Sequence, residues 1–219
     1  LKTAVEDLNP DNKDDSTDQI AYIIKSLLLE IDSYPPKNLI LSLNGRDAII
    51  RPLELPPINN EKFIDPSNMI KYELSTHLPL SLDQTCYNYR ILSIDSEKTR
   101  VLTAAIKRSI LTRLLKSLSM YGIHPDFITI SSLVLYNAFV IKGLIDNDLM
   151  GLVYLRSSGG DIIISEFGYI SYARSFSVQE GASKESILKE LSNSFETYYR
   201  SRPKTQKNIA SNINIVLED

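Results

Sequence analysis

The last third of the sequence limits the fold more than any other part of it. The stretch "LVYLRSSGGDIIISEFG", residues 152–168, contains two apolar segments of strand length around a short polar turn, and "YISYARSFSV" supplies a third. A helical pattern over residues 183–200 and the apolar segment "INIVL" follow. Three antiparallel strands, a helix and a further strand are typical of one half of a ribonuclease-H-like layer fold.

The first third of the chain predicts a shorter version of the same arrangement. Ser16 and Gln19 have the spacing of a capping box, and the helix that they open ends before Pro35. The apolar segment "NLILSL" then predicts a buried strand. Asn44 and Gly45 predict a hairpin turn into a second strand, "AIIRPLEL".

The middle of the chain predicts a helix, two strands, a second helix, a short strand and a third helix. These elements are expected at residues 65–78, at "CYNYRILSI" and "TRVLTAAI", at residues 106–122, at "FITI" and at residues 131–142. We therefore predict an α/β protein with mixed sheets flanked by helices.

Composition excludes several classes of function. A net charge of −3 argues against nucleic acid as the main partner, because binding its phosphates requires a basic face. Cys86, His77 and His124 are the only cysteine and histidines, so no zinc ligand set and no nucleophile with its base is recognisable. We expect no metal site and no catalytic residue. Because no signal-peptide pattern or membrane-spanning run is present, we expect a soluble, cytoplasmic protein.

Three stretches carry a resemblance to a known family. They are "RPLELPP" at residues 51–57, "YELSTHLPLSLDQ" at residues 72–84 and "YGIHPDFI" at residues 121–128. In order and spacing, roughly residues 18–217 resemble the pilus-assembly proteins of the PilM type. The same layout is similar to the cytoplasmic part of the type II secretion protein GspL and, more distantly, to the division protein FtsA.

The resemblance implies an actin-like ATPase fold, which is a ribonuclease-H-like fold, with a small inserted α+β subdomain. Residues 1–55 are then expected to form part of the first actin-like subdomain, and residues 56–128 the inserted subdomain. Residues 129–219 are expected to supply the remainder of the first subdomain and the start of the second. Relative to the family, we expect the chain to be truncated at both ends.

The resemblance also implies a nucleotide site built from two phosphate loops. The first loop is expected before residue 1, and the second corresponds to the turn within residues 152–168. Small residues in such a turn suit a phosphate cradle, but they also suit any tight hairpin. The family has an aspartate and a glycine where this chain has Tyr154 and Arg156, and a tyrosine cannot replace a carboxylate that holds Mg²⁺.

We therefore predict a degenerate phosphate loop that does not support ATP hydrolysis, with no cofactor bound to this chain. Binding of ATP and Mg²⁺ by the full-length protein is left open. Because Arg156 can pair with an anion, phosphate binding without hydrolysis is an alternative. The residues of this loop are Arg156, Ser157, Ser158, Gly159 and Gly160.

The function implied by the resemblance is that of a scaffold. Such a protein is cytoplasmic and peripheral at the inner membrane, binds the N-terminal tail of a membrane partner, and couples it to a motor ATPase of a type IV pilus or type II secretion machine. The tail is expected in a groove between the first and the inserted subdomain. The expected anchors are Leu53, Leu55, Tyr87 and Tyr89, although burial of these four in the core explains them equally well. The alternative function is an ATP hydrolase or kinase of the same fold whose first phosphate loop precedes residue 1.

Overall fold

The computed structural model describes residues 16–58, 66–145, 149–156, 159–179, 183–201 and 212–217. Its helices are α1 (Ser16–Glu30), α2 (Pro66–His77), α3 (Arg108–Met120), α4 (Ser131–Ile141) and α5 (Lys184–Ser201), with short 3-10 turns η1 (Gly45–Asp47) and η3 (Leu82–Gln84). Its strands are β1 (Ile40–Leu43), β2 (Ala48–Leu55), β3 (Thr85–Ile94), β4 (Thr99–Lys107), β5 (Phe127–Ile130), β6 (Met150–Arg156), β7 (Gly159–Glu166), β8 (Tyr169–Ser177) and β9 (Asn212–Leu217).

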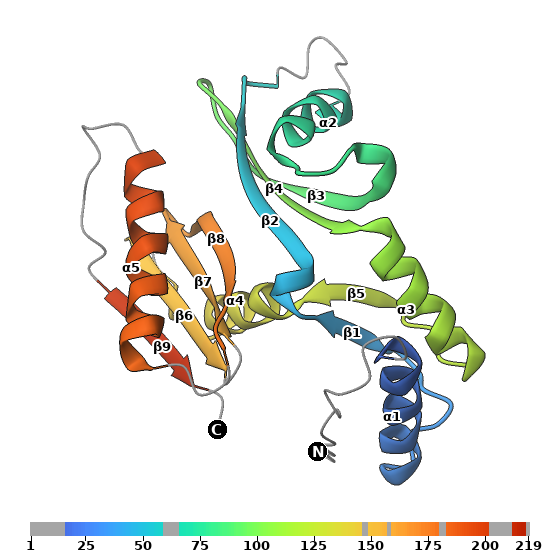
Figure 1. Ribbon diagram of the computed structural model, residues 1–219. Helices are drawn as coiled ribbons and strands as arrows, with labels where there is room; N and C mark the ends of the chain where they lie inside the picture. Colours follow the sequence, from blue (N-terminus) through green and yellow to red (C-terminus); the bar gives the residue numbers. More distant parts are fainter. Residues whose placement is uncertain are drawn as a thin grey trace.

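Within these ranges the strands form three sheets. β1 and β5 make a parallel pair, and β2, β4 and β3 make an antiparallel sheet in that order. β8, β7, β6 and β9 make a mixed sheet, in which β9 runs parallel to β6 and the other pairs are antiparallel. Figure 1 shows α5 lying along one face of the four-stranded sheet and α2 beside the three-stranded sheet.

The four-stranded sheet has an apolar core on each face, because consecutive strand residues point to opposite sides. On one face, Val153 and Ile162 pack with Tyr198 of α5. On the other face, Ile163 packs with Tyr136 of α4. β7 is consequently buried along almost its whole length, which explains why Ile162, Ile163 and Ile164 follow one another without an intervening polar residue.

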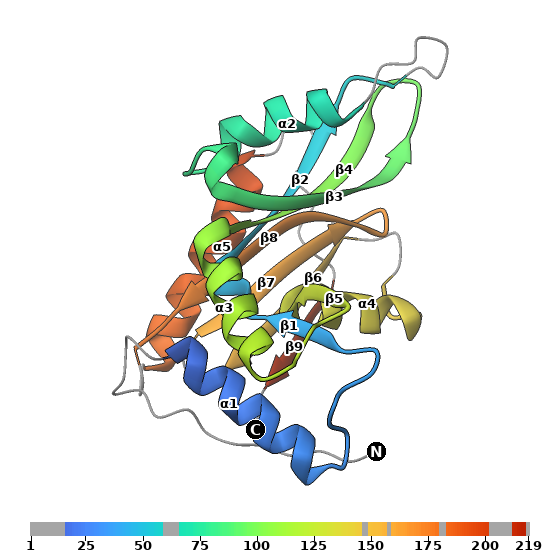
Figure 2. The same ribbon diagram turned by 90° about the vertical axis from the view of Figure 1, so that its right-hand side faces the viewer.

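The two smaller sheets each have a helical cover. α2 places Ile70 and Leu74, both fully buried, against the three-stranded sheet. α1 and α3 lie side by side and enclose Ala21 and Leu118 together with residues of β1 (Figure 2). In the part of the chain that the structure describes, no helix has the length and apolar character needed to cross a bilayer.

The predicted order of elements in the last third is confirmed by β6, β7, β8, α5 and β9. The predicted hairpin at Asn44 and Gly45 is wrong, because β1 pairs with β5 and β2 pairs with β4. The Asn44 side chain accepts the Arg46 backbone N–H at 3.0 Å and caps η1, which directs the chain from one sheet into another. The helix predicted from residue 106 begins at Arg108 instead, because β4 continues to Lys107.

The strand pairing also bears on the predicted subdomains. β2 falls within the predicted segment 1–55, yet it shares a sheet with β3 and β4 of the predicted insertion 56–128. The boundary at residue 55 therefore separates strands of one sheet, and the three-part division stays a prediction.

Candidate functional site

The turn between β6 and β7 is where the sequence predicts a degenerate phosphate loop. Arg156 is the partner of Gly159 in the antiparallel pairing, so two residues connect the strands. These two, Ser157 and Ser158, lie outside the described residues. The other predicted loop residues, Arg156, Gly159 and Gly160, lie at the paired ends of β6 and β7.

Gly159 and Gly160 are required by the packing of the sheet itself. A Cβ on Gly159 would lie 2.9 Å from the Ser177 Cα and closer still to the Phe176 carbonyl oxygen, and the φ of Gly159 is +145°. A Cβ on Gly160 would lie 2.6 Å from the Tyr154 carbonyl oxygen. Because these neighbours are backbone atoms of β6 and β8, side chains at either position would force the strands apart.

The Arg156 side chain turns onto the sheet and pairs with Asp161. Its Nη2 lies 3.2 Å from the Asp161 Oδ2, and the two side chains are only 11% and 2% exposed. The guanidinium carbon also lies 5.1 Å from the centre of the Tyr154 ring, within the range of a cation–π contact. The positive charge that a phosphate would need is thus already compensated by a buried carboxylate.

The sequence analysis did not predict that Asp161 pairs with Arg156. A two-residue turn places Asp161 opposite Tyr154 and diagonal to Arg156 on one face of the sheet. The register of the predicted hairpin therefore already indicated that Arg156 and Asp161 could pair. Among the described residues, no group of three or more His, Cys, Asp or Glu is arranged to hold a metal ion.

The four predicted partner-binding residues are brought together in one cluster. Leu53 and Leu55 are each only 4% exposed, and Tyr87 and Tyr89 pack half-buried against the same core. This position, between α2 and the three-stranded sheet, makes Leu53 and Leu55 interior residues. A partner contact by Tyr87 and Tyr89 stays a prediction.

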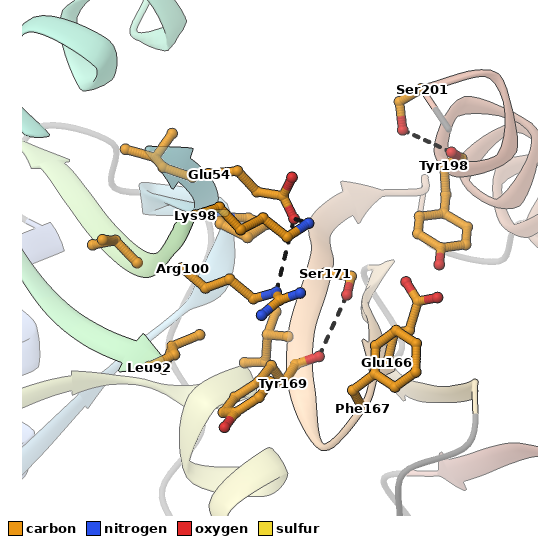
Figure 3. Close-up of a pocket in the computed structure, with 14 residues that line it drawn as sticks. Glu54, Leu92, Lys98, Arg100, Glu166, Phe167, Tyr169, Ser171, Tyr198 and Ser201 are labelled. Atoms are coloured by element: carbon orange, nitrogen blue, oxygen red, sulfur yellow. Dashed lines mark hydrogen bonds and ion pairs between the residues drawn. The ribbon is translucent and has the colours of Figure 1, made fainter. Parts of the chain in front are cut away.

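A cavity of about 390 Å³ opens between the three-stranded sheet, the β7–β8 turn and α5 (Figure 3). On one wall, Lys98 forms an ion pair with Glu54, and the Arg100 Nε lies 3.8 Å from the same carboxylate. Glu166, Phe167, Tyr169 and Tyr198 line it from β7, the β7–β8 turn, β8 and α5. Leu53 is the member of the predicted partner-binding cluster that also lines this cavity.

Two titrating groups near the cavity have perturbed pKa values. Backbone N–H groups of Lys98 and then Glu97 donate to the Asp95 carboxylate at 2.8 and 2.9 Å, and these bonds hold the pKa of Asp95 below its usual value. Burial raises the pKa of Tyr136, whose hydroxyl donates to the Gly168 carbonyl at 2.9 Å and ties α4 to the β7–β8 turn.

Comparison with known proteins identifies the fold. No protein-family model matches the chain, and no curated protein matches it at a significant level. A solved structure described as a PilM-PilN type IV pilus biogenesis complex contains a chain that superimposes with a TM-score of 0.63 and 16% sequence identity. The match covers 85% of this chain and 56% of that chain.

A second structure is a Bacteroides thetaiotaomicron protein described as having an actin-like ATPase fold and unknown function. It aligns with a TM-score of 0.48 and 20% identity over 81% of this chain and 62% of that chain. The chain thus spans 56% of the length of the PilM-PilN chain that it matches. At 16% identity this likeness shows the fold alone: the chain has the α/β fold of that PilM-PilN chain, as its sequence motifs predict.

Proposed function

We propose that this chain is part of a scaffold of a type IV pilus or type II secretion platform, cytoplasmic and peripheral at the inner membrane. It binds the N-terminal tail of a membrane partner and couples that partner to a motor ATPase. The observation that carries the proposal is the shared fold with a chain of a PilM-PilN type IV pilus biogenesis complex. The three sequence motifs at residues 51–57, 72–84 and 121–128 support it independently.

We further propose that the scaffold does not hydrolyse ATP. Hydrolysis requires the phosphates and their metal ion to be clamped where charge develops. Tyr154 offers no carboxylate for a metal ion, and Arg156 is paired with Asp161 at 3.2 Å. Losing a metal clamp removes several kcal/mol of transition-state stabilisation, and each ~1.4 kcal/mol is a factor of ten in rate. Turnover of ATP should therefore be lower by about two or more orders of magnitude than in an ATPase of this fold that keeps the carboxylate.

Tyr89 is the best place to test partner binding, because it combines partial burial with a position on the edge strand β3. The ligand is a synthetic peptide with the N-terminal tail sequence of the type IV pilus or type II secretion membrane protein from the same source. We expect the peptide to bind the wild-type chain in a calorimetric titration. Tyr89→Ala should weaken binding by about thirtyfold, since central aromatic anchors contribute ~2 kcal/mol or more.

Tyr72→Ala is the matched control, because Tyr72 is a 73% exposed tyrosine on α2 outside the cluster. It should bind the peptide as the wild type does. Circular dichroism establishes that each variant is folded. No peptide binding by the wild type, or equal binding by a folded Tyr89→Ala variant, would contradict the proposed site.

A further inference from the structure

A buried polar cluster lies where η1 meets the four-stranded sheet. Its centre is Asp161 of β7, which is 2% exposed. The Asp161 Oδ1 accepts a hydrogen bond of 2.5 Å from the hydroxyl of Ser175, its neighbour on β8, and its Oδ2 faces Arg156 at 3.2 Å. One carboxylate therefore links all three antiparallel strands of this sheet on the face away from α5.

The fourth member of the cluster comes from a distant part of the sequence. Gly45, the first residue of η1, is buried against the cluster. A Cβ on Gly45 would lie within 2.5 Å of the Asp161 Oδ1 and even closer to the Ser175 hydroxyl oxygen. A side chain at this position would have to displace Asp161 and Ser175, so the backbone of η1 lies directly against the carboxylate and the hydroxyl.

This contact matters because η1 lies between two of the sheets in the chain. η1 connects β1 of the two-stranded sheet to β2 of the three-stranded sheet, and β2 also contacts β8. The cluster therefore lies where the segment that joins the two smaller sheets contacts the four-stranded sheet.

The charges of Arg156 and Asp161 balance each other, but several of their polar atoms lack hydrogen bonds. In the described part of the chain, the Arg156 Nε and Nη2 and the Asp161 Oδ2 make no hydrogen bond. The two groups are held by charge alone at 3.2 Å. Because desolvation of such a pair is only partly offset by its attraction, it contributes more to fixing one arrangement than to overall stability.

We propose that Asp161, with Arg156 and Ser175, is a latch that holds η1 on the four-stranded sheet. The latch sets the position of the three-stranded sheet by an internal charge pair, without a bound nucleotide. It goes beyond the proposed scaffold role and does not depend on the identity of the membrane partner.

Amide hydrogen exchange on the full chain tests the latch. For each variant, exchange is measured in the segment that lies across the contact from the substituted residue. Asp161→Asn keeps the size of the side chain and removes its charge, leaving the buried Arg156 uncompensated. We expect exchange in residues 45–55 to become about a hundredfold faster, because removing one partner of a buried pair is strongly destabilising. The matched control is Glu190→Gln, which removes the half-exposed Arg174–Glu190 ion pair, also of 3.2 Å, and should leave residues 45–55 unchanged.

Gly45→Ala tests the same contact from the side of η1. It also provides a test of the latch if Asp161→Asn does not fold. Its added methyl group displaces the Asp161 and Ser175 side chains. We expect faster exchange in β7 and β8, far from residue 45 in the sequence. The latch is contradicted if Asp161→Asn accelerates exchange only within β6, β7 and β8, or if Gly45→Ala accelerates exchange only around η1.

Discussion

Three glycine substitutions separate the two physical reasons for which this chain needs glycine. Gly143→Ala changes a residue with φ +67° and no atom within 4 Å of the added Cβ, so it introduces backbone strain alone. Gly160→Ala adds a Cβ 2.6 Å from the Tyr154 carbonyl oxygen at an ordinary φ, so it introduces a steric clash alone. Gly159→Ala combines a φ of +145° with a clash against the backbone of β8.

The expected losses in the free energy of unfolding follow from these geometries. A left-handed conformation costs an alanine about 1–2 kcal/mol, so Gly143→Ala should lose about that much. Overpacking against a fixed neighbour costs about 1–3 kcal/mol, which is the expected loss for Gly160→Ala. Gly159→Ala should lose about 2–5 kcal/mol, the sum of both effects.

Urea unfolding followed by circular dichroism measures the series. With a slope of about 2–3 kcal/mol per molar urea, the Gly159→Ala midpoint should fall by about 0.7–2.5 M. If Gly159→Ala is as stable as the wild type, the sheet does not require this glycine. The glycine pair would then need another explanation, such as a phosphate cradle.

Three further predictions concern the core and the cavity. Leu74→Ala removes a fully buried side chain beneath α2 and should lower the free energy of unfolding by about 2–5 kcal/mol in urea titrations, whereas a loss under about 1 kcal/mol would mean that α2 does not cover the sheet. The pKa of Asp95 is held below 3.8 chiefly by the Lys98 backbone N–H, so its contribution is present above that pH and is lost as pH falls through the lower folded-state pKa. Thermal unfolding should show a smaller acid loss for Asp95→Asn, and an unchanged acid loss would contradict the assignment. Tyr136→Phe leaves the Gly168 carbonyl without this donor and should cost about 1 kcal/mol. Because burial raises the pKa of Tyr136 above 10.0, its contribution is complete below that pH and is lost as pH rises through the folded-state pKa, so the wild type should lose more stability there than Tyr136→Phe.

The elements that the sequence predicted correctly are those with a strong local pattern. β6, β7 and β8 follow from apolar runs bounded by turn residues, and α5 follows from its helical periodicity. The hairpin at Asn44 and Gly45 failed because the same pair of residues can cap a 3-10 turn, and only the pairing of β1 with β5 decides between the two. Strand partners distant in the sequence leave no local signal.

The candidate site divides in the same way. The pairing of Arg156 with Asp161 follows from the register of a two-residue hairpin, so the sequence contained it. The contact of Gly45 with Asp161 and Ser175 depends on how the sheets are joined, and no short-range sequence pattern encodes that arrangement. The burial of Leu53 and Leu55 likewise depends on α2 covering their face of the sheet.

A phosphate-release assay on the full-length protein with ATP and Mg²⁺ tests the scaffold account most directly. Because Arg156 is compensated by Asp161 and the glycines serve strand packing, we expect no phosphate release above that of buffer. Phosphate release that depends on Mg²⁺ and rises in proportion to protein concentration would contradict the account and would favour an ATP hydrolase of the same fold.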